Sequence, residues 1–196
     1  MKSSARVVVI GGGVAGVATL YHLAKKGWAD VVLVERKELT SGSTWHAAGL
    51  LPLFNMSYSV GQIHKYSVDF YQRLEKETGH SVGFRQVSNI RLAMSEDRLD
   101  EYRYYAGVAR TIGVDVRLLS PDEVQTIWPL CRTDGLLGAI QHPDDGYIQP
   151  ADLTQALAAG ARSLGAEIYR HNAVTALAEL PGGGWSVTTD DGVIDC

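Results

Sequence analysis

Glycines at three fixed positions carry the clearest chemical signal in this chain. Gly11, Gly13 and Gly16 form a G-x-G-x-x-G motif between a β-branched run and an amphipathic run. The first glycine of such a motif permits a tight turn, the second lets backbone approach a pyrophosphate, and the third allows close helix–strand packing. Glu35 ends the next apolar run, where a carboxylate accepts hydrogen bonds from ribose hydroxyls and disfavours a 2′-phosphate. These residues predict a dinucleotide site and argue against NADP, although glycine turns also serve packing alone.

The segment SGSTWHAAGL, residues 41–50, is the second chemical signal. After the second strand of a parallel sheet the chain passes the carboxyl edge, where a dinucleotide lies. Ser43 and Thr44 offer hydroxyl groups to phosphate oxygens, and the small residues 47–49 allow close approach of a flat ring. His46 is therefore placed to reach that ring system, or else it is an ordinary surface or packing histidine. No role is assigned to the other histidines, which are His22, His64, His80, His142 and His171.

Strand and helix patterns place both signals on one structural unit. Residues 5–27 read as a β-branched strand, a glycine turn and a helix that ends at Gly27. The apolar face expected for this helix consists of Val17, Leu20, Leu23 and Ala24. The run DVVLVER, residues 30–36, supplies a second strand. Strand, helix and strand in succession predict a right-handed βαβ unit and a parallel sheet.

The remaining patterns predict further helices and short strands. A helix is expected from Val60 to about Gly79, a strand over 85–94, and a helix capped by Ser95. The sequence SPDE at 120–123 is a capping box with proline at the first helical position. Another helix follows Pro150, and the last residues alternate as a β-meander around glycine-rich turns.

Composition excludes several classes of function. Apolar residues make up 45% of the 196 residues, but no run approaches the roughly 18 apolar residues that a membrane span needs. The net charge of −4, with acids and bases interspersed, gives no basic patch for nucleic acid. Cys131 and Cys196 lie far apart and form no metal-binding spacing. From this spacing we expect no metal site. Because no signal or transit peptide pattern opens the chain, we expect a cytoplasmic protein.

The chain resembles the amino-terminal part of the dimethylglycine and sarcosine dehydrogenase family, within the D-amino-acid-oxidase-like flavoproteins. The resemblance covers nearly all 196 residues and includes VVVIGGGVAGVATLYHLAKKG, RLLSPDEVQTIWPL and HPDDGYIQPADLTQALAAGARSLGA, with GSTWHAAGL as its most discriminating piece. In that family the histidine of this motif carries the flavin covalently at the 8α-methyl carbon. The resemblance therefore implies FAD attached through His46. By position it implies cofactor contacts from Gly11, Gly13, Val14, Ala15, Gly16, Glu35, Arg36, Ser43, Thr44, Trp45, His46, Leu50 and Val174.

The activity implied by the resemblance is oxidative N-demethylation. A hydride would pass from the N-methyl group of a small amino acid, such as dimethylglycine or sarcosine, to FAD. Electrons would leave to an electron-transfer flavoprotein or to oxygen, and longer family members also bind tetrahydrofolate. Because family members are much longer, we expect a truncated domain, with the catalytic residues beyond Cys196 and none assigned here.

Two alternatives stay open at this point. The chain could belong to a related amine, amino-acid or glycerol-phosphate oxidoreductase that binds FAD without a covalent bond. It could also be an inactive nucleotide-binding module that pairs with a partner chain, or with itself, through an exposed sheet edge.

The expected fold class is α/β. It combines a Rossmann-like parallel βαβ FAD-binding sheet with a β-meander and part of an inserted α+β substrate domain. Residues 1–80 are expected to form the FAD-binding core and the following helix, 81–150 the partial substrate domain, and 151–196 the return to the FAD-binding domain.

Overall fold

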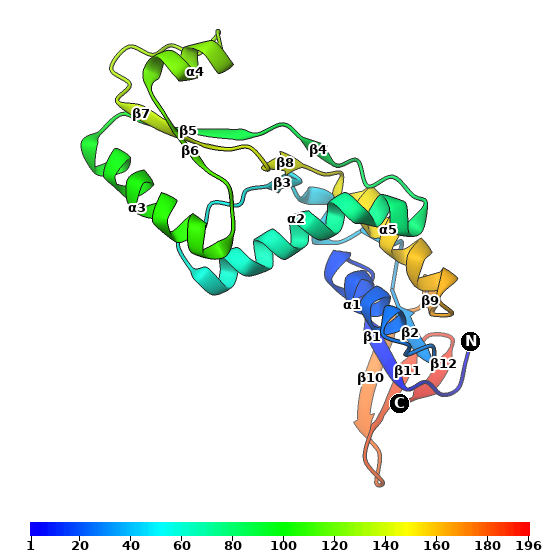
Figure 1. The fold of residues 1–196 in the computed structure, drawn as a ribbon. Coiled ribbons are helices and arrows are strands. Elements are labelled where there is room, and N and C mark those ends of the chain that lie inside the picture. Colours follow the sequence, from blue (N-terminus) through cyan, green and yellow to red (C-terminus); the bar gives the residue numbers. More distant parts are fainter. The chain divides into compact units, whose positions relative to one another are not determined.

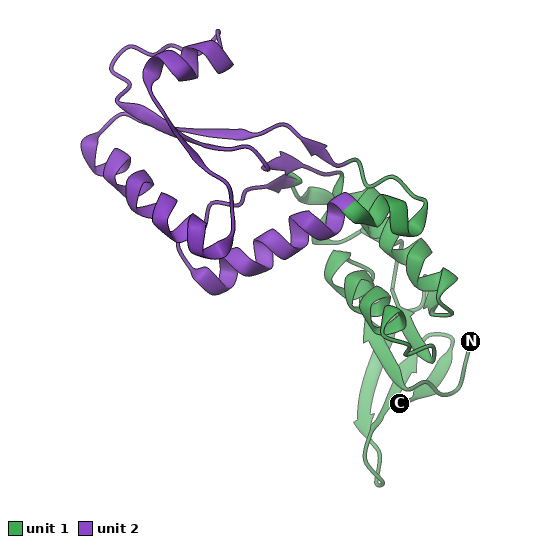
Figure 2. Ribbon diagram, viewed as in Figure 1, with its two compact units in different colours: residues 1–49, 73–83, 149–196 green, residues 50–72, 84–148 purple.

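The computed structural model describes residues 1–196, which divide into two compact units (Figure 2). Unit 1, green in the figure, contains residues 1–49, 73–83 and 149–196. Unit 2, purple, contains residues 50–72 and 84–148. The predicted mixed α/β fold with a parallel sheet is confirmed. The assignment of cofactor and substrate roles to the two units stays a prediction.

Unit 1 is built on a three-stranded parallel sheet in the order β1–β2–β9, formed by Val7–Ile10, Val31–Val34 and Glu167–Tyr169. All four residues of β2 are buried, as expected for a central strand of a parallel sheet covered on both faces. Val32 and Val34 pack with Ile194 in one apolar cluster. Ile194 belongs to the predicted β-meander, which consists of β10 (Val174–Glu179), β11 (Trp185–Thr189) and β12 (Gly192–Asp195).

Two helices of unit 1, α1 (Val14–Lys25) and α5 (Pro150–Ser163), pack against each other (Figure 1). The helices approach closely at Gly160, where an added Cβ would lie 2.7 Å from the Tyr21 ring. The buried face of α1 consists of Val17, Leu20, Tyr21 and Ala24. Leu23, predicted on this face, is only half-buried, because the i, i+3, i+4, i+7 spacing places Tyr21 there instead.

Unit 2 contains two small antiparallel sheets, one in the order β5–β7–β6 and the other in the order β3–β8–β4. Its strands are β3 (Leu50–Leu51), β4 (Arg85–Gln86), β5 (Asn89–Ala93), β6 (Arg117–Leu119), β7 (Gly138–His142) and β8 (Gly146–Tyr147). Its helices are α3 (Glu96–Ile112), α4 (Pro121–Ile127) and the first part of α2 (Tyr58–Thr78). The strand predicted over 85–94 is two strands, because Ser88 has a φ of 69° and interrupts the pairing.

Local signals in unit 2 largely act as predicted. Ser120 and Glu123 form the predicted capping box at the start of α4. Ser95 caps α3 by accepting the Arg98 N–H, and Gly113 ends that helix in the left-handed region. None of the helices combines the length and apolar character that crossing a bilayer requires.

Candidate functional site

The glycine turn between β1 and α1 has a conformation that other residues adopt poorly. Gly11 has a φ of +108°, which L side chains rarely adopt. At Gly16 an added Cβ would lie 2.0 Å from the carbonyl oxygen of Gly11. The turn therefore requires glycine at both positions, the first for its backbone angle and the second for close approach of helix and strand.

The carboxylate of Glu35 is fixed beside this turn by backbone. Its Oε2 accepts the Gly12 N–H at 2.6 Å, and its Oε1 accepts the Lys37 N–H at 2.8 Å. A carboxylate offers about four lone-pair sites, so two remain for ligand hydroxyl groups. Because Glu35 directly follows β2, the fold itself brings this acceptor to the carboxyl edge of the sheet.

The segment 43–46 forms a short 3-10 helix, η1, that is tied to the start of α1. The buried Thr44 Oγ1 accepts the Val14 N–H at 3.0 Å. The next N–H groups of the first turn, on Ala15 and Gly16, have no carbonyl partner within the helix. They present donors and the positive end of the helix dipole, which is the usual arrangement for binding phosphate.

One cleft of about 480 Å³ in unit 1 gathers most of the predicted residues. The predicted residues that line it are Gly11, Gly13, Val14, Ala15, Glu35, Arg36, Ser43 and Thr44. Four further lining residues were missed by the sequence reasoning: Gly12, Lys37, Ser41 and Gly42. Gly12, Lys37 and Gly42 are chain neighbours of predicted residues, and Ser41 opens the segment SGSTWHAAGL, so membership of the two motifs or adjacency to Arg36 was the signal that could have found them.

A second, smaller cavity in unit 1, of about 210 Å³, includes Val174. It shares Gly11, Glu35 and Arg36 with the cleft, so the two cavities lie next to each other. Val174 opens β10, immediately after the turn that follows β9. The Glu35 carboxylate can accept hydrogen bonds from ligand hydroxyl groups, and the N–H groups at the start of α1 can donate to phosphates. This combination suits the ADP part of a dinucleotide.

His46 and Trp45 lie at the end of η1 and do not line the cleft. Both side chains are exposed, and their ring centroids are 3.9 Å apart. The His46 Nδ1 lies 3.2 Å from the Gly42 carbonyl oxygen. Because a carbonyl only accepts, this contact places the proton on Nδ1 and leaves the Nε2 lone pair open.

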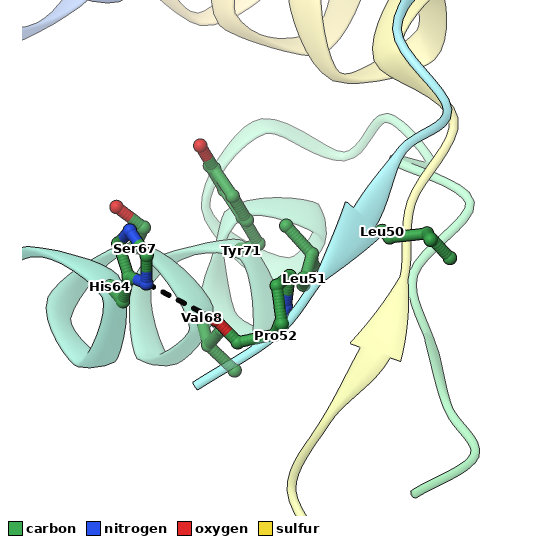
Figure 3. A pocket seen from close by; sticks show the side chains of 7 residues that line it. All are labelled: Leu50, Leu51, Pro52, His64, Ser67, Val68 and Tyr71. Carbon is green, nitrogen blue, oxygen red and sulfur yellow. Dashed lines mark hydrogen bonds between the residues drawn. The ribbon is translucent and has the colours of Figure 1, made fainter. Parts of the chain in front are cut away.

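Leu50 belongs to unit 2, where it pairs with Tyr147 between β3 and β8. It also lines a cavity of about 200 Å³ between β3 and α2, shown in Figure 3. The His64 Nδ1 lies 3.1 Å from the Pro52 carbonyl oxygen, and the Ser67 hydroxyl donates to the Ile63 carbonyl. Since these polar groups already bond to backbone, the cavity offers few open donors, and no reaction is assigned to it.

Comparison with known proteins identifies the relatives of the chain. The sequence profile of the family described as FAD dependent oxidoreductase (DAO) matches residues 6–196. Mitochondrial dimethylglycine dehydrogenase from Rattus norvegicus is 43% identical over 193 residues, which cover 98% of this chain and 22% of that protein. Mitochondrial sarcosine dehydrogenase from Homo sapiens is 40% identical over 178 residues, which cover 90% of this chain and 19% of that protein. The chain thus spans about a fifth of the length of these curated relatives.

Solved structures show the same fold. L-proline dehydrogenase from P. horikoshii superposes with a TM-score of 0.90 at 26% sequence identity. The match covers 100% of this chain and 51% of that chain. The resemblance predicted from GSTWHAAGL and the glycine motif is therefore confirmed at the level of the family and the fold.

Proposed function

The chain belongs to the FAD-dependent oxidoreductase family, and we propose that the cleft of unit 1 binds the ADP part of FAD. The observation that carries the proposal is the Glu35 carboxylate, held by two backbone N–H groups beside the open N-terminus of α1. In this arrangement Glu35 accepts hydrogen bonds from the ribose hydroxyls. The N–H groups of Ala15 and Gly16 donate hydrogen bonds to the pyrophosphate. Arg36 is exposed and lines both cavities, where it would contact the ribose and adenine edge.

The other predicted residues complete this proposed site. Gly13, Val14, Ser43 and Thr44 line the phosphate end of the cleft. Val174 lines the smaller cavity, where it would contact the adenine with its backbone. Trp45 lies against the His46 ring, beside the proposed point of flavin attachment. A contact between Leu50 and the flavin stays part of the proposal.

We further propose that His46 holds the flavin covalently through Nε2. The Nδ1 proton is directed at the Gly42 carbonyl, so Nε2 is the ring nitrogen with a free lone pair. No other side chain of η1 is a comparable nucleophile at neutral pH, since its remaining residues are serine, threonine and tryptophan. The proposal also rests on the resemblance of GSTWHAAGL to the family motif.

For the longer protein that the relatives represent, we propose oxidation of the N-methyl group of a small amino acid such as dimethylglycine or sarcosine. FAD, when bound, supplies the hydride acceptor. The residues of this chain bind and orient the cofactor, and none is proposed as the acid or base. An electron-transfer flavoprotein as acceptor and tetrahydrofolate as a second cofactor belong to the same proposal.

Intact mass under denaturing conditions, together with the absorbance spectrum, tests the cofactor proposal. We expect protein supplied with FAD to absorb as a flavoprotein and to gain the mass of FAD. His46→Ala should abolish the added mass, whereas His80→Ala, at an exposed histidine outside the site, should keep it. Flavin released from protein of unmodified mass would favour non-covalent binding. Colourless protein of unmodified mass would contradict the cofactor proposal.

A further inference from the structure

A buried polar cluster lies wholly within unit 2, and none of its residues lines the proposed cofactor cleft. Asn89 and His142 face each other directly across β5 and β7. Arg91 lies two residues along β5 and therefore on the same face. His142 is 0% exposed, and Asp145, three residues after it, is 2% exposed.

Five polar atoms of this cluster have no hydrogen-bond partner in the protein. They are Asn89 Oδ1, Arg91 Nε, Asp145 Oδ2 and both ring nitrogens of His142. Buried polar atoms in folded proteins are satisfied in the great majority of cases, by protein atoms or by ordered water. Five such atoms on neighbouring residues are therefore too many to be left unsatisfied, and they point to a guest molecule.

The surroundings of the cluster supply few hydrogen bonds of their own. The rings of Phe54 and Tyr105 lie with centroids 5.9 and 5.5 Å from that of His142. The Arg91 guanidinium carbon lies 4.3 Å from the Phe54 ring centroid. The Tyr105 hydroxyl is engaged, because it donates to the Leu53 carbonyl at 3.0 Å. Aromatic walls of this kind exclude bulk solvent but do not satisfy the polar atoms between them.

The charges of the cluster restrict the chemistry of the guest. The Arg91 guanidinium disfavours a metal cation, and the Asp145 carboxylate disfavours an anion. Burial lowers the pKa of His142 to about 4, so its neutral ring offers one donor and one acceptor at neutral pH. The guest must therefore be uncharged and able both to donate and to accept hydrogen bonds. Water meets all of these conditions.

We propose that ordered water occupies this cluster and bridges His142 to Asp145, with Asn89 and Arg91 as its remaining partners. This water site has a structural consequence. The other oxygen of Asp145, Oδ1, accepts the Leu53 N–H at 2.8 Å. By fixing the carboxylate, the bridging water holds the backbone at Leu53. The preceding residue, Pro52, lines the cavity in Figure 3. The proposal is independent of cofactor binding.

A high-resolution crystal structure of the unaltered chain tests this proposal. We expect an ordered water within hydrogen-bond distance of both a His142 ring nitrogen and Asp145 Oδ2. A direct hydrogen bond between these two side chains would overturn the proposal. A His142 ring turned out to solvent would overturn it as well.

Magnetic relaxation dispersion, which detects long-lived internal water, gives a second readout in solution. We expect His142→Leu to reduce the internal-water signal, because leucine has no polar atom to hold the bridge. His142→Gln, which keeps a donor and an acceptor, should retain more of the signal, and the exposed control His80→Leu should leave it unchanged. Equal signals from all of these proteins would contradict the proposal. If His142→Leu fails to fold, the crystallographic result on the unaltered chain still decides.

Discussion

At the scale of single residues, the side chains nearest the cleft bond first to backbone. Glu35 accepts two backbone N–H groups, and Thr44 accepts a third from Val14 at the start of α1. These bonds fix the side chains before any ligand arrives, which reduces the conformational entropy lost on binding. Preorganisation of this kind makes substitutions at Glu35 and Thr44 informative about both stability and binding.

Glu35→Gln should weaken the binding of ADP about 10- to 100-fold. A neutral amide has one oxygen for the two N–H groups of Gly12 and Lys37, so its NH₂ group faces a donor. The loss of charge-assisted hydrogen bonds of about 1.5–3 kcal/mol sets this range. Calorimetric titration with ADP measures the effect, and Glu75→Gln on the exposed surface of α2 is the matched control. Equal affinities of the two variants for ADP would show that Glu35 does not contribute to ADP binding.

Thr44→Val keeps the shape of the side chain but removes the acceptor for the Val14 N–H. We expect the free energy of unfolding to fall by about 1 kcal/mol, as for the loss of a helix N-cap. Urea unfolding compares this variant with Thr19→Val, at an exposed threonine of α1. If the free energies of unfolding of Thr44→Val and Thr19→Val were equal, the hydrogen bond between Thr44 and Val14 would not contribute to stability.

At the scale of elements, the glycine turn decides where α1 sits on the sheet. The N-terminus of α1 can reach a ligand only because Gly16 lets the helix lie against the Gly11 carbonyl. Since η1 is tied to the same turn through Val14, a shift of α1 would also move the segment that ends at His46. The geometry of the cofactor site therefore depends on one close contact.

Gly16→Ala should destabilise the protein by about 1–3 kcal/mol, because the new methyl group overpacks against the Gly11 carbonyl. Gly107→Ala is the matched control, since Gly107 lies in α3 with no atom near an added Cβ. That control should gain about 0.5–1 kcal/mol from the higher helix propensity of alanine. Denaturant unfolding of both variants measures the difference. Stabilisation by Gly16→Ala would contradict the packing described for the turn.

The elements show which parts of the structure the sequence can predict. The glycine motif, Glu35, Ser43 and Thr44 are close in sequence and follow from one βαβ rule, so their shared cleft was predictable. The Thr44 hydrogen bond to Val14 and the pairing of Asn89 with His142 depend on how the chain returns over long separations. No local pattern encodes those contacts. His142 was therefore assigned no role from the sequence, where only its proximity to PDDGY set it apart from the other histidines.

At the scale of the whole molecule, each unit has its own core, and the core of unit 2 includes ionisable groups. Burial raises the pKa of Asp145 to about 6 from its ordinary 3.8. Burial, followed by the Arg91 charge, lowers the pKa of His142 to about 4 from 6.5. Arg91 lowers the pKa of Asp145 as well, and Asp144 raises it. Folding thus favours a protonated Asp145 and an unprotonated His142, and their effects on stability oppose each other.

The opposed shifts of these two groups largely cancel, so the pair itself adds little pH dependence to the stability between about pH 4 and 6, and the effect of each variant is measured relative to the unaltered chain. In His142→Asn, the raised pKa of Asp145 remains, so the free energy of unfolding should fall as pH rises from about 4 to 6. In Asp145→Asn, the lowered pKa of His142 remains, so the free energy should fall as pH drops from 6.5 to about 4. Each change should reach about 3 kcal/mol, at about 1.4 kcal/mol per pKa unit.

Urea unfolding across this pH range tests the prediction, with the exposed His80→Asn as control. The control should follow the unaltered chain. After subtraction of the unaltered chain's pH profile, slopes of the same sign in His142→Asn and Asp145→Asn would show that the two groups are not shifted in opposite directions.

The central claim is that unit 1 binds FAD through its ADP part. The most direct test titrates FAD into the His46→Ala variant, in which binding cannot become covalent, and then adds ADP as a competitor. We expect saturable binding of one FAD per chain, displaced by ADP and weakened by adding Glu35→Gln. A His46→Ala protein that is folded but binds neither FAD nor ADP would contradict it.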